Sequence, residues 1–176
     1  MSTVTSTETP AAARTGWRTS RVAQAMQAAI DAMQRIPHSF IAFLARFSIA
    51  AVFWKSGQTK VEGFAVDIVS GELQLGWPRV SDTAVALFRE EYQLPLIAPE
   101  FAAPLAAAAE HVFPLLLLAG LATRLSALAL LGMTLVIQLL VYPGAYATHG
   151  TWAALLLYLM ARGPGVLSVD HWLARR

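Results

Sequence analysis

The stretch FAAPLAAAAEHVFPLLLLAGLATRLSALALLGMTLVIQLLVY, residues 101–142, decides the fold of this chain. A helix that crosses a bilayer needs roughly 20 consecutive apolar residues, and this stretch is long enough for two crossings. Residues 120–124, GLATR, interrupt it and predict a tight turn, so the stretch is expected to form a helical hairpin. Glu110 lies inside the first half, where a carboxylate is costly and needs a partner or a function.

The composition of the whole chain also indicates a membrane protein. Of 176 residues, 56% are hydrophobic and 14% are charged, and the mean hydropathy is +0.53. Soluble domains carry about 25% charged residues. The net charge of +2 gives no reason to expect a nucleic-acid partner. The chain has no cysteine, which excludes disulfides, thiol catalysis and thiolate metal sites.

Residues 1–37 are expected to precede the membrane domain. The first 20 residues are rich in Thr, Ser, Ala and Pro and predict a disordered arm. Residues 21–37, RVAQAMQAAIDAMQRIP, place apolar side chains at helical spacing. They predict a short helix that lies in the membrane interface and ends at Pro37.

Residues 38–172 are expected to form an all-α, integral membrane four-helix bundle, followed by a short tail at 173–176. The first expected span covers residues 40–54, with a start near His38 and a continuation into residues 55–57. The second starts near Glu100 and ends before the turn at 120–124, and the third and fourth cover residues 125–142 and 149–161. Residues 55–100 form the one long polar segment and predict an insertion between the first two spans. Within it, GELQLGWP (71–78) predicts a turn-rich loop, and Ser81 predicts the cap of a helix over residues 82–92.

Lys and Arg in the flanks predict the orientation. Eight lie before the first span, in the central turn or after the last span, and four lie in the insertion. This distribution predicts a multi-pass protein with both termini in the cytoplasm and an extracytoplasmic insertion.

Arg46 and Glu110 are the two charges expected inside the bilayer. They lie equally far from the expected outer ends of their spans, Lys55 and Phe101, so they are expected to pair at the same depth. Two interpretations stay open: the pair is a structural clasp between two helices, or it sets the charge of a ligand site.

A second group of side chains is expected in the outer half of the bundle. Interfacial aromatic residues are one explanation of it, and a cavity for a quinone or a small polar ligand is the other. His111 and His149 alone are too few ligands for a metal site. The candidate pocket residues are Trp54, Lys55, Lys60, His111, Gln138, Tyr142 and His149.

Several motifs together resemble the DoxX family of four-helix bacterial membrane proteins. They are an arginine in the first span, FWKSGQTK (53–60), EHVFPLLLLAGLATR (110–124) and GPGVLSVD (163–170). Arg46, Lys60, Glu110 and Arg124 match charged positions of the family pattern. The segments EEYQLPLIAPEFAA, VIQLLVYP and HGTWAALLLYL are similar to DoxX proteins found beside enzymes that modify metal-binding peptides.

The resemblance implies a bacterial inner-membrane protein linked to redox systems, because the family is associated with thiosulfate:quinone oxidoreductase. The leading hypothesis is an accessory, non-catalytic protein of a redox or metal-stress system that binds a partner protein or a quinone-like ligand. The alternatives are a membrane subunit of a quinone-linked oxidoreductase and a small transporter subunit.

Overall fold

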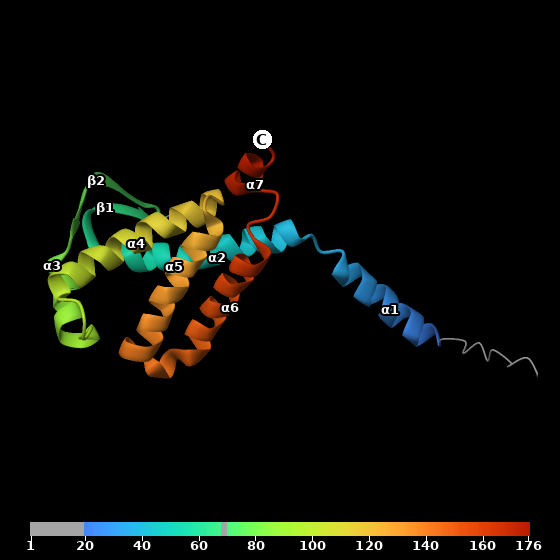
Figure 1. Ribbon diagram of the computed structural model, residues 1–176, viewed down its shortest axis with the longest axis horizontal. Coiled ribbons are helices and arrows are strands. Elements are labelled where there is room, and N and C mark those ends of the chain that lie inside the picture. Colours follow the sequence, from blue (N-terminus) through green and yellow to red (C-terminus); the bar gives the residue numbers. More distant parts are fainter. Residues whose placement is uncertain (1–19, 68–69) are drawn as a thin grey trace, which may run out of the picture. The chain divides into compact units, whose positions relative to one another are not determined.

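The computed structural model describes residues 20–67 and 70–176 (Figure 1). The chain divides into two compact units, residues Met1–Ile36 and Pro37–Arg176. In the first unit, helix α1 spans Arg21–Gln34 as its apolar spacing predicted, and the Ser20 hydroxyl caps it by accepting from the Ala23 N–H at 3.2 Å. The disordered arm expected for residues 1–20 lies, apart from Ser20, outside the described residues.

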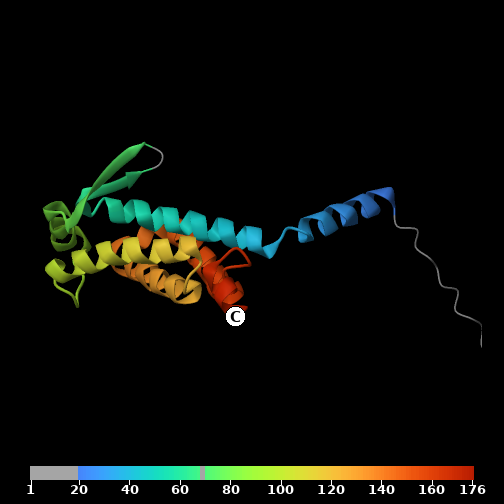
Figure 2. The ribbon, with the colours of Figure 1, turned by 90° about the horizontal axis from the view of Figure 1, so that it is seen from above.

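Four helices of the second unit pack in a ring, in which α2 and α5 each contact both α4 and α6. Figure 2 shows α2 and α4 lying side by side along their length. The four helices are α2 (His38–Gln58), α4 (Pro99–Ala119), α5 (Thr123–Val136, continued by the π-helical segment η2, Ile137–Val141) and α6 (Tyr146–Arg162, preceded by the 3-10 turn η3, Pro143–Ala145).

Three of these helices are long and apolar enough to cross a membrane: α2, α4, and α5 with its continuation η2. α6 has 17 residues and is shorter than these three.

The second unit is apolar outside as well as inside. Phe40, Phe43 and Phe47 are exposed along α2, whereas Arg46 of the same helix is buried. Such an exposed apolar surface suits a lipid environment rather than water.

The insertion contains two strands, so the all-α prediction is wrong for this segment. β1 (Val61–Asp67) and β2 (Glu72–Val80) pair antiparallel, with Phe64 opposite Leu75 and Val66 opposite Leu73. Apolar residues occupy every second position of β2, at Leu73, Leu75 and Trp77, which is the spacing of a strand. The glycines and the proline of this segment predicted a turn-rich loop instead.

The helix predicted after Ser81 is present. α3 (Asp82–Leu87) continues into the π-helical segment η1 (Phe88–Tyr92), and Ser81 Oγ accepts from the Ala84 N–H at 3.1 Å. Figure 1 shows the hairpin and α3 at one end of the bundle and the C-terminal helix α7 at the other. We call these the insertion end and the turn end, because the second includes the turn between α4 and α5.

The turn end is held together by the C-terminal segment. Ser168 caps α7 (Val169–Ala174) by accepting from the His171 N–H at 3.2 Å. The Asp170 carboxylate accepts from the Ala122 and Thr123 N–H groups at 2.7 and 2.9 Å and so caps the start of α5. The Asp170 N–H donates in turn to the Gly120 carbonyl at 2.9 Å. The C-terminal segment is therefore an integral part of the bundle.

Gly120 ends α4 in the left-handed conformation, with φ of 67°. A Cβ atom there would lie 2.5 Å from the Ser168 Cβ and 2.6 Å from the Arg46 Nη1. Gly120→Ala is therefore expected to lower the free energy of unfolding by more than about 1 kcal/mol. Thermal unfolding in detergent measures this loss. Gly132→Ala is the matched control, because a Cβ at Gly132 meets no atom within 4 Å. An equal loss in both variants would contradict the prediction.

Candidate functional site

The packing of α2 against α4 brings Glu110 to the insertion end of α2. A Cβ atom built on Gly57 would lie 3.0 Å from the Glu110 Cβ, so these two residues face each other. Ser56 Oγ donates to Glu110 Oε1 at 3.2 Å. Glu110 therefore lies beside the last turn of α2 and not beside its middle.

Lys60 is the partner of Glu110. It lies two residues after the end of α2, and its Nζ lies 2.7 Å from Glu110 Oε2. Lys60 Nζ also donates to Ser56 Oγ at 3.1 Å. Lys60 and Glu110 are 4% and 3% exposed, so both charges are removed from solvent and rely on each other.

The predicted pair between Arg46 and Glu110 does not form. Arg46 is 1% exposed and lies at the turn end, where Nη1 donates to the Leu117 and Leu118 carbonyls at 3.0 Å each. Nη2 donates to the Leu167 carbonyl at 2.5 Å. The guanidinium thus binds the carbonyl groups at the C-terminus of α4, where a cation is favoured by the helix dipole.

Arg46 and Glu110 do not pair because α2 and α4 do not end level with each other, as equal depth would require. In the structure, the first turns of α4 continue past α2 and pack against α3 and η1 of the insertion. Phe88 of η1, with Ala102 and Ala103 of α4, forms a separate small apolar cluster there. The offset moves Glu110 away from Arg46 and toward Lys60.

A cavity of about 190 Å³ opens beside the Lys60–Glu110 pair. Apart from Ser56, Lys60, Glu110 and the Tyr92 hydroxyl, its lining side chains are apolar. The apolar lining comes from η1, from the chain that follows it, from α4, and from α5 with η2, and it includes Phe88, Leu94, Ile97, Leu105, Ala106, Met133, Ile137 and Val141. The site is thus an apolar cavity with one buried ion pair in its wall.

Two π-helical segments contribute to this wall, η1 through Phe88 and Tyr92 and η2 through Ile137 and Val141. Such wide turns are rare and often mark functional sites. The two segments are joined at the rim, because the Tyr142 hydroxyl donates to Glu91 and the rings of Tyr92 and Tyr142 lie 5.8 Å apart. Burial raises the pKa of Tyr92, and the hydrogen bond to Glu91 raises the pKa of Tyr142. Both phenols therefore stay protonated at neutral pH.

Trp54 and His111 lie under the hairpin rather than in the cavity wall. Trp54 Nε1 donates to the Val66 carbonyl at 3.0 Å, and its ring lies 5.0 Å from that of His111. His111 Nδ1 donates to the Ala107 carbonyl at 2.6 Å, and its Nε2 accepts from Gln58 Nε2 at 2.8 Å. Gln58 Oε1 accepts from the Val66 N–H at 2.6 Å. These contacts fasten β1 to α2 and α4.

Gln138 and His149 form a third, separate group. His149 Nδ1 donates to Gln138 Oε1 at 2.7 Å, and Gln138 Nε2 donates to the Pro143 carbonyl at 2.6 Å. This group holds the connection between α5 and α6.

Lys55, the last of the candidate residues, is exposed on α2. Of the nine candidate residues, only Lys60 and Glu110 thus line the cavity, and Tyr142 lies at its rim.

Ser56 and Tyr92 are site residues that were not among the candidates. Ser56 lies four residues before Lys60, which places both on one side of the chain at the end of α2. Tyr92 shares one face of the predicted insertion helix with Phe88. Neither spacing indicated a cavity, because the cavity forms only where the insertion folds against α4 and α5. Within residues 20–67 and 70–176, no group of three or more His, Cys, Asp or Glu side chains is placed to hold a metal ion.

Comparison with known sequences gives one match. A family model described as DoxX matches residues 41–143. This region covers Arg46, Lys60 and Glu110, together with the insertion and every residue that lines the cavity. No curated protein and no solved structure matches the chain.

Proposed function

We propose a ligand-binding function for this chain, which belongs to the DoxX family of membrane proteins because the family model covers more than half of its length. The ligand is a quinone-like molecule, with an apolar ring and an oxygen substituent. The chain acts as an accessory protein of a redox or metal-stress system. The buried Lys60–Glu110 pair in the wall of an apolar cavity carries this proposal.

The size of the cavity supports a single ring as the bound part. Its volume of about 190 Å³ is larger than the roughly 150 Å³ that suffices for benzene in an engineered apolar cavity. It is smaller than the roughly 300–1,000 Å³ of sites that enclose drug-sized ligands. A quinone ring fits this range, and its isoprenoid tail would extend outside the cavity.

The polar wall supports recognition of an oxygen substituent, with the hydroxyl of the quinol form as the best match. Lys60 already has the acceptors Ser56 and Glu110. Glu110 Oε1 accepts from Ser56, whereas Oε2 meets only the Lys60 ammonium among the described residues. A carboxylate has about four acceptor positions, so Glu110 has capacity left for a ligand hydroxyl.

The membrane arrangement that we propose has four spans in the bacterial inner membrane, with α6 as the fourth. At 1.5 Å per residue, the 17 residues of α6 reach about 25 Å, and a short span is accommodated by local thinning of the bilayer. The flanking Lys and Arg support cytoplasmic termini and an extracytoplasmic insertion. The cavity would then open in the outer half of the membrane.

Binding of a short-chain benzoquinol to the purified full-length protein tests this function. Isothermal titration in mild detergent measures the affinity, and Ala106→Phe, which fills the cavity from α4, is expected to weaken it by about tenfold or more. Ala108→Phe is the matched control, because Ala108 lies on the same helix but is exposed. It is expected to bind like the unchanged protein.

The proposal fails if the unchanged protein does not bind the quinol, or if Ala106→Phe and Ala108→Phe bind it equally well. Oxidation of the quinol by the purified protein, with a soluble electron acceptor added, would contradict an accessory role and favour the oxidoreductase subunit. Uptake of a substrate into reconstituted vesicles, without quinol binding, would favour the transporter.

A further inference from the structure

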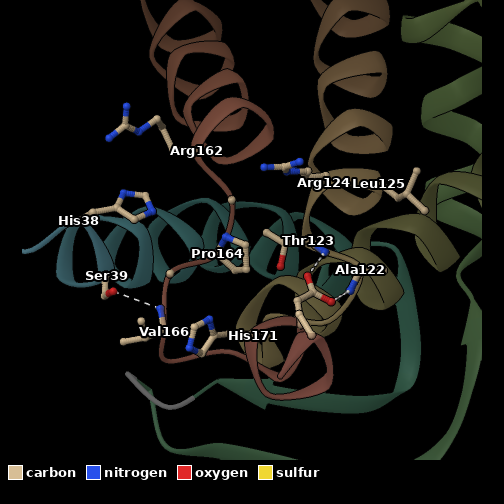
Figure 3. A pocket seen from close by; sticks show the side chains of 14 residues that line it. His38, Ser39, Ala122, Thr123, Arg124, Leu125, Arg162, Pro164, Val166 and His171 are labelled. Carbon is tan, nitrogen blue, oxygen red and sulfur yellow. Dashed lines mark hydrogen bonds between the residues drawn. The ribbon is translucent and has the colours of Figure 1, made fainter. Parts of the chain in front are cut away.

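A second and larger cavity, of about 500 Å³, lies at the turn end of the bundle. Its walls are the start of α2, the start of α5, the end of α6, and the loop and helix α7 that follow (Figure 3). The proposed quinone-like site makes no use of it. Its lining contains two arginines, Arg124 and Arg162, and two histidines, His38 and His171.

Neither arginine has a hydrogen bond or an ion pair to another described residue. Figure 3 shows Arg162 and His38 on one side of Pro164, and Arg124 on the other. Arg124 reaches back toward Gly163, since a Cβ built on Gly163 would lie 3.6 Å from Arg124 Nη2. Two unpaired guanidinium groups therefore border one hollow.

Asp170 is the one acid in this lining. Both of its oxygens accept hydrogen bonds from the backbone at the start of α5, through Ala122 and Thr123. The carboxylate thus serves as a helix cap and forms no salt bridge with either arginine. The cavity keeps a surplus of positive charge.

Two buried polar atoms of the lining have no hydrogen-bond partner among the described residues. Thr123 is fully buried and its Oγ1 is unpaired, and the buried Nε2 of His171 is unpaired as well. Buried polar atoms usually have a partner in the protein, in water or in a ligand. His38 differs, because its Nδ1 lies 2.8 Å from the Tyr158 hydroxyl.

We propose that this cavity binds the phosphate of an anionic phospholipid, with Arg124 and Arg162 as its charged ligands. Arginine binds phosphate through paired N–H groups, and basic pockets between membrane helices bind anionic headgroups. A lipid is favoured over free phosphate because the same lining contains two exposed apolar side chains, Leu125 and Val166. The acyl chains would run along these residues. This inference is independent of the quinone-like site.

Native mass spectrometry of the full-length protein, released from nanodiscs of phosphatidylcholine with a minor share of cardiolipin, tests the proposal. The unchanged protein is expected to retain cardiolipin selectively. The double variant Arg124→Gln/Arg162→Gln is expected to lose about tenfold or more of that affinity. Arg175→Gln is the control, because Arg175 is an exposed arginine after α7 that is outside the cavity lining. It is expected to retain cardiolipin, and circular dichroism confirms that each variant is folded.

The proposal is overturned if the double variant retains as much cardiolipin as the unchanged protein. It is also overturned if Arg175→Gln loses as much as the double variant, which would show diffuse surface attraction. Inorganic phosphate is added in a separate arm. Displacement of cardiolipin by phosphate alone would make free phosphate the ligand and contradict the lipid assignment.

Discussion

Replacing Lys60 with methionine is expected to lower the free energy of unfolding of the membrane unit by about 3–5 kcal/mol. The substitution leaves the Glu110 carboxylate buried, 3% exposed, with Ser56 as its remaining hydrogen-bond partner. A buried charge without its counter-charge is far more costly than the absence of both. Thermal or denaturant unfolding in mild detergent measures the loss.

The double variant Lys60→Met/Glu110→Leu separates this effect from a general loss of packing. It removes both charges and is expected to recover most of the stability that Lys60→Met loses. The control for charge removal is Arg89→Met, since the Arg89–Glu100 pair is exposed and such pairs contribute about 0–1 kcal/mol. If Lys60→Met is no more destabilising than Arg89→Met, Lys60 does not hold the Glu110 charge.

Replacing Arg46 with methionine is also expected to cost about 3–5 kcal/mol of stability. Arg46 donates to the carbonyl groups of Leu117, Leu118 and Leu167. The Leu117 carbonyl also accepts from the Gly120 N–H at 3.0 Å, whereas Arg46 is the one donor to the other two carbonyls among the described residues. The substitution would leave the Leu118 and Leu167 carbonyl groups without this donor and would remove the link that Arg46 makes between α4 and the C-terminal segment.

Arg46→Lys distinguishes hydrogen-bond geometry from charge. Lysine keeps the cation near the C-terminus of α4 but lacks the planar fork that reaches three carbonyl groups. It is therefore expected to recover less than half of the stability lost in Arg46→Met. Full recovery would show that charge alone is sufficient. Lys55→Met, on the exposed side of α2, is the control and is expected to change the stability by less than about 0.5 kcal/mol.

Local signals in the sequence were sufficient to predict the helices. The apolar runs located α2, α4 and α5 with η2, Gly120 marked the end of a helix, and Ser81 marked a helix cap. Each of these features depends on side chains within a few positions of the chain. The hairpin β1–β2 was missed because its position depends on Trp54 and Gln58 of α2, which bind Val66 across the fold.

The candidate site was likewise predictable from the sequence only in part. The sequence by itself determined that Glu110 is a membrane carboxylate in need of a partner, since hydropathy alone shows how costly it is there. Only the tertiary structure decided that Lys60 and not Arg46 is the partner. Two antiparallel helices can shift along each other by several residues without any change in their own apolar patterns. The packing of the insertion against the first turns of α4 selects one offset, and that offset places Glu110 at the end of α2 beside Lys60.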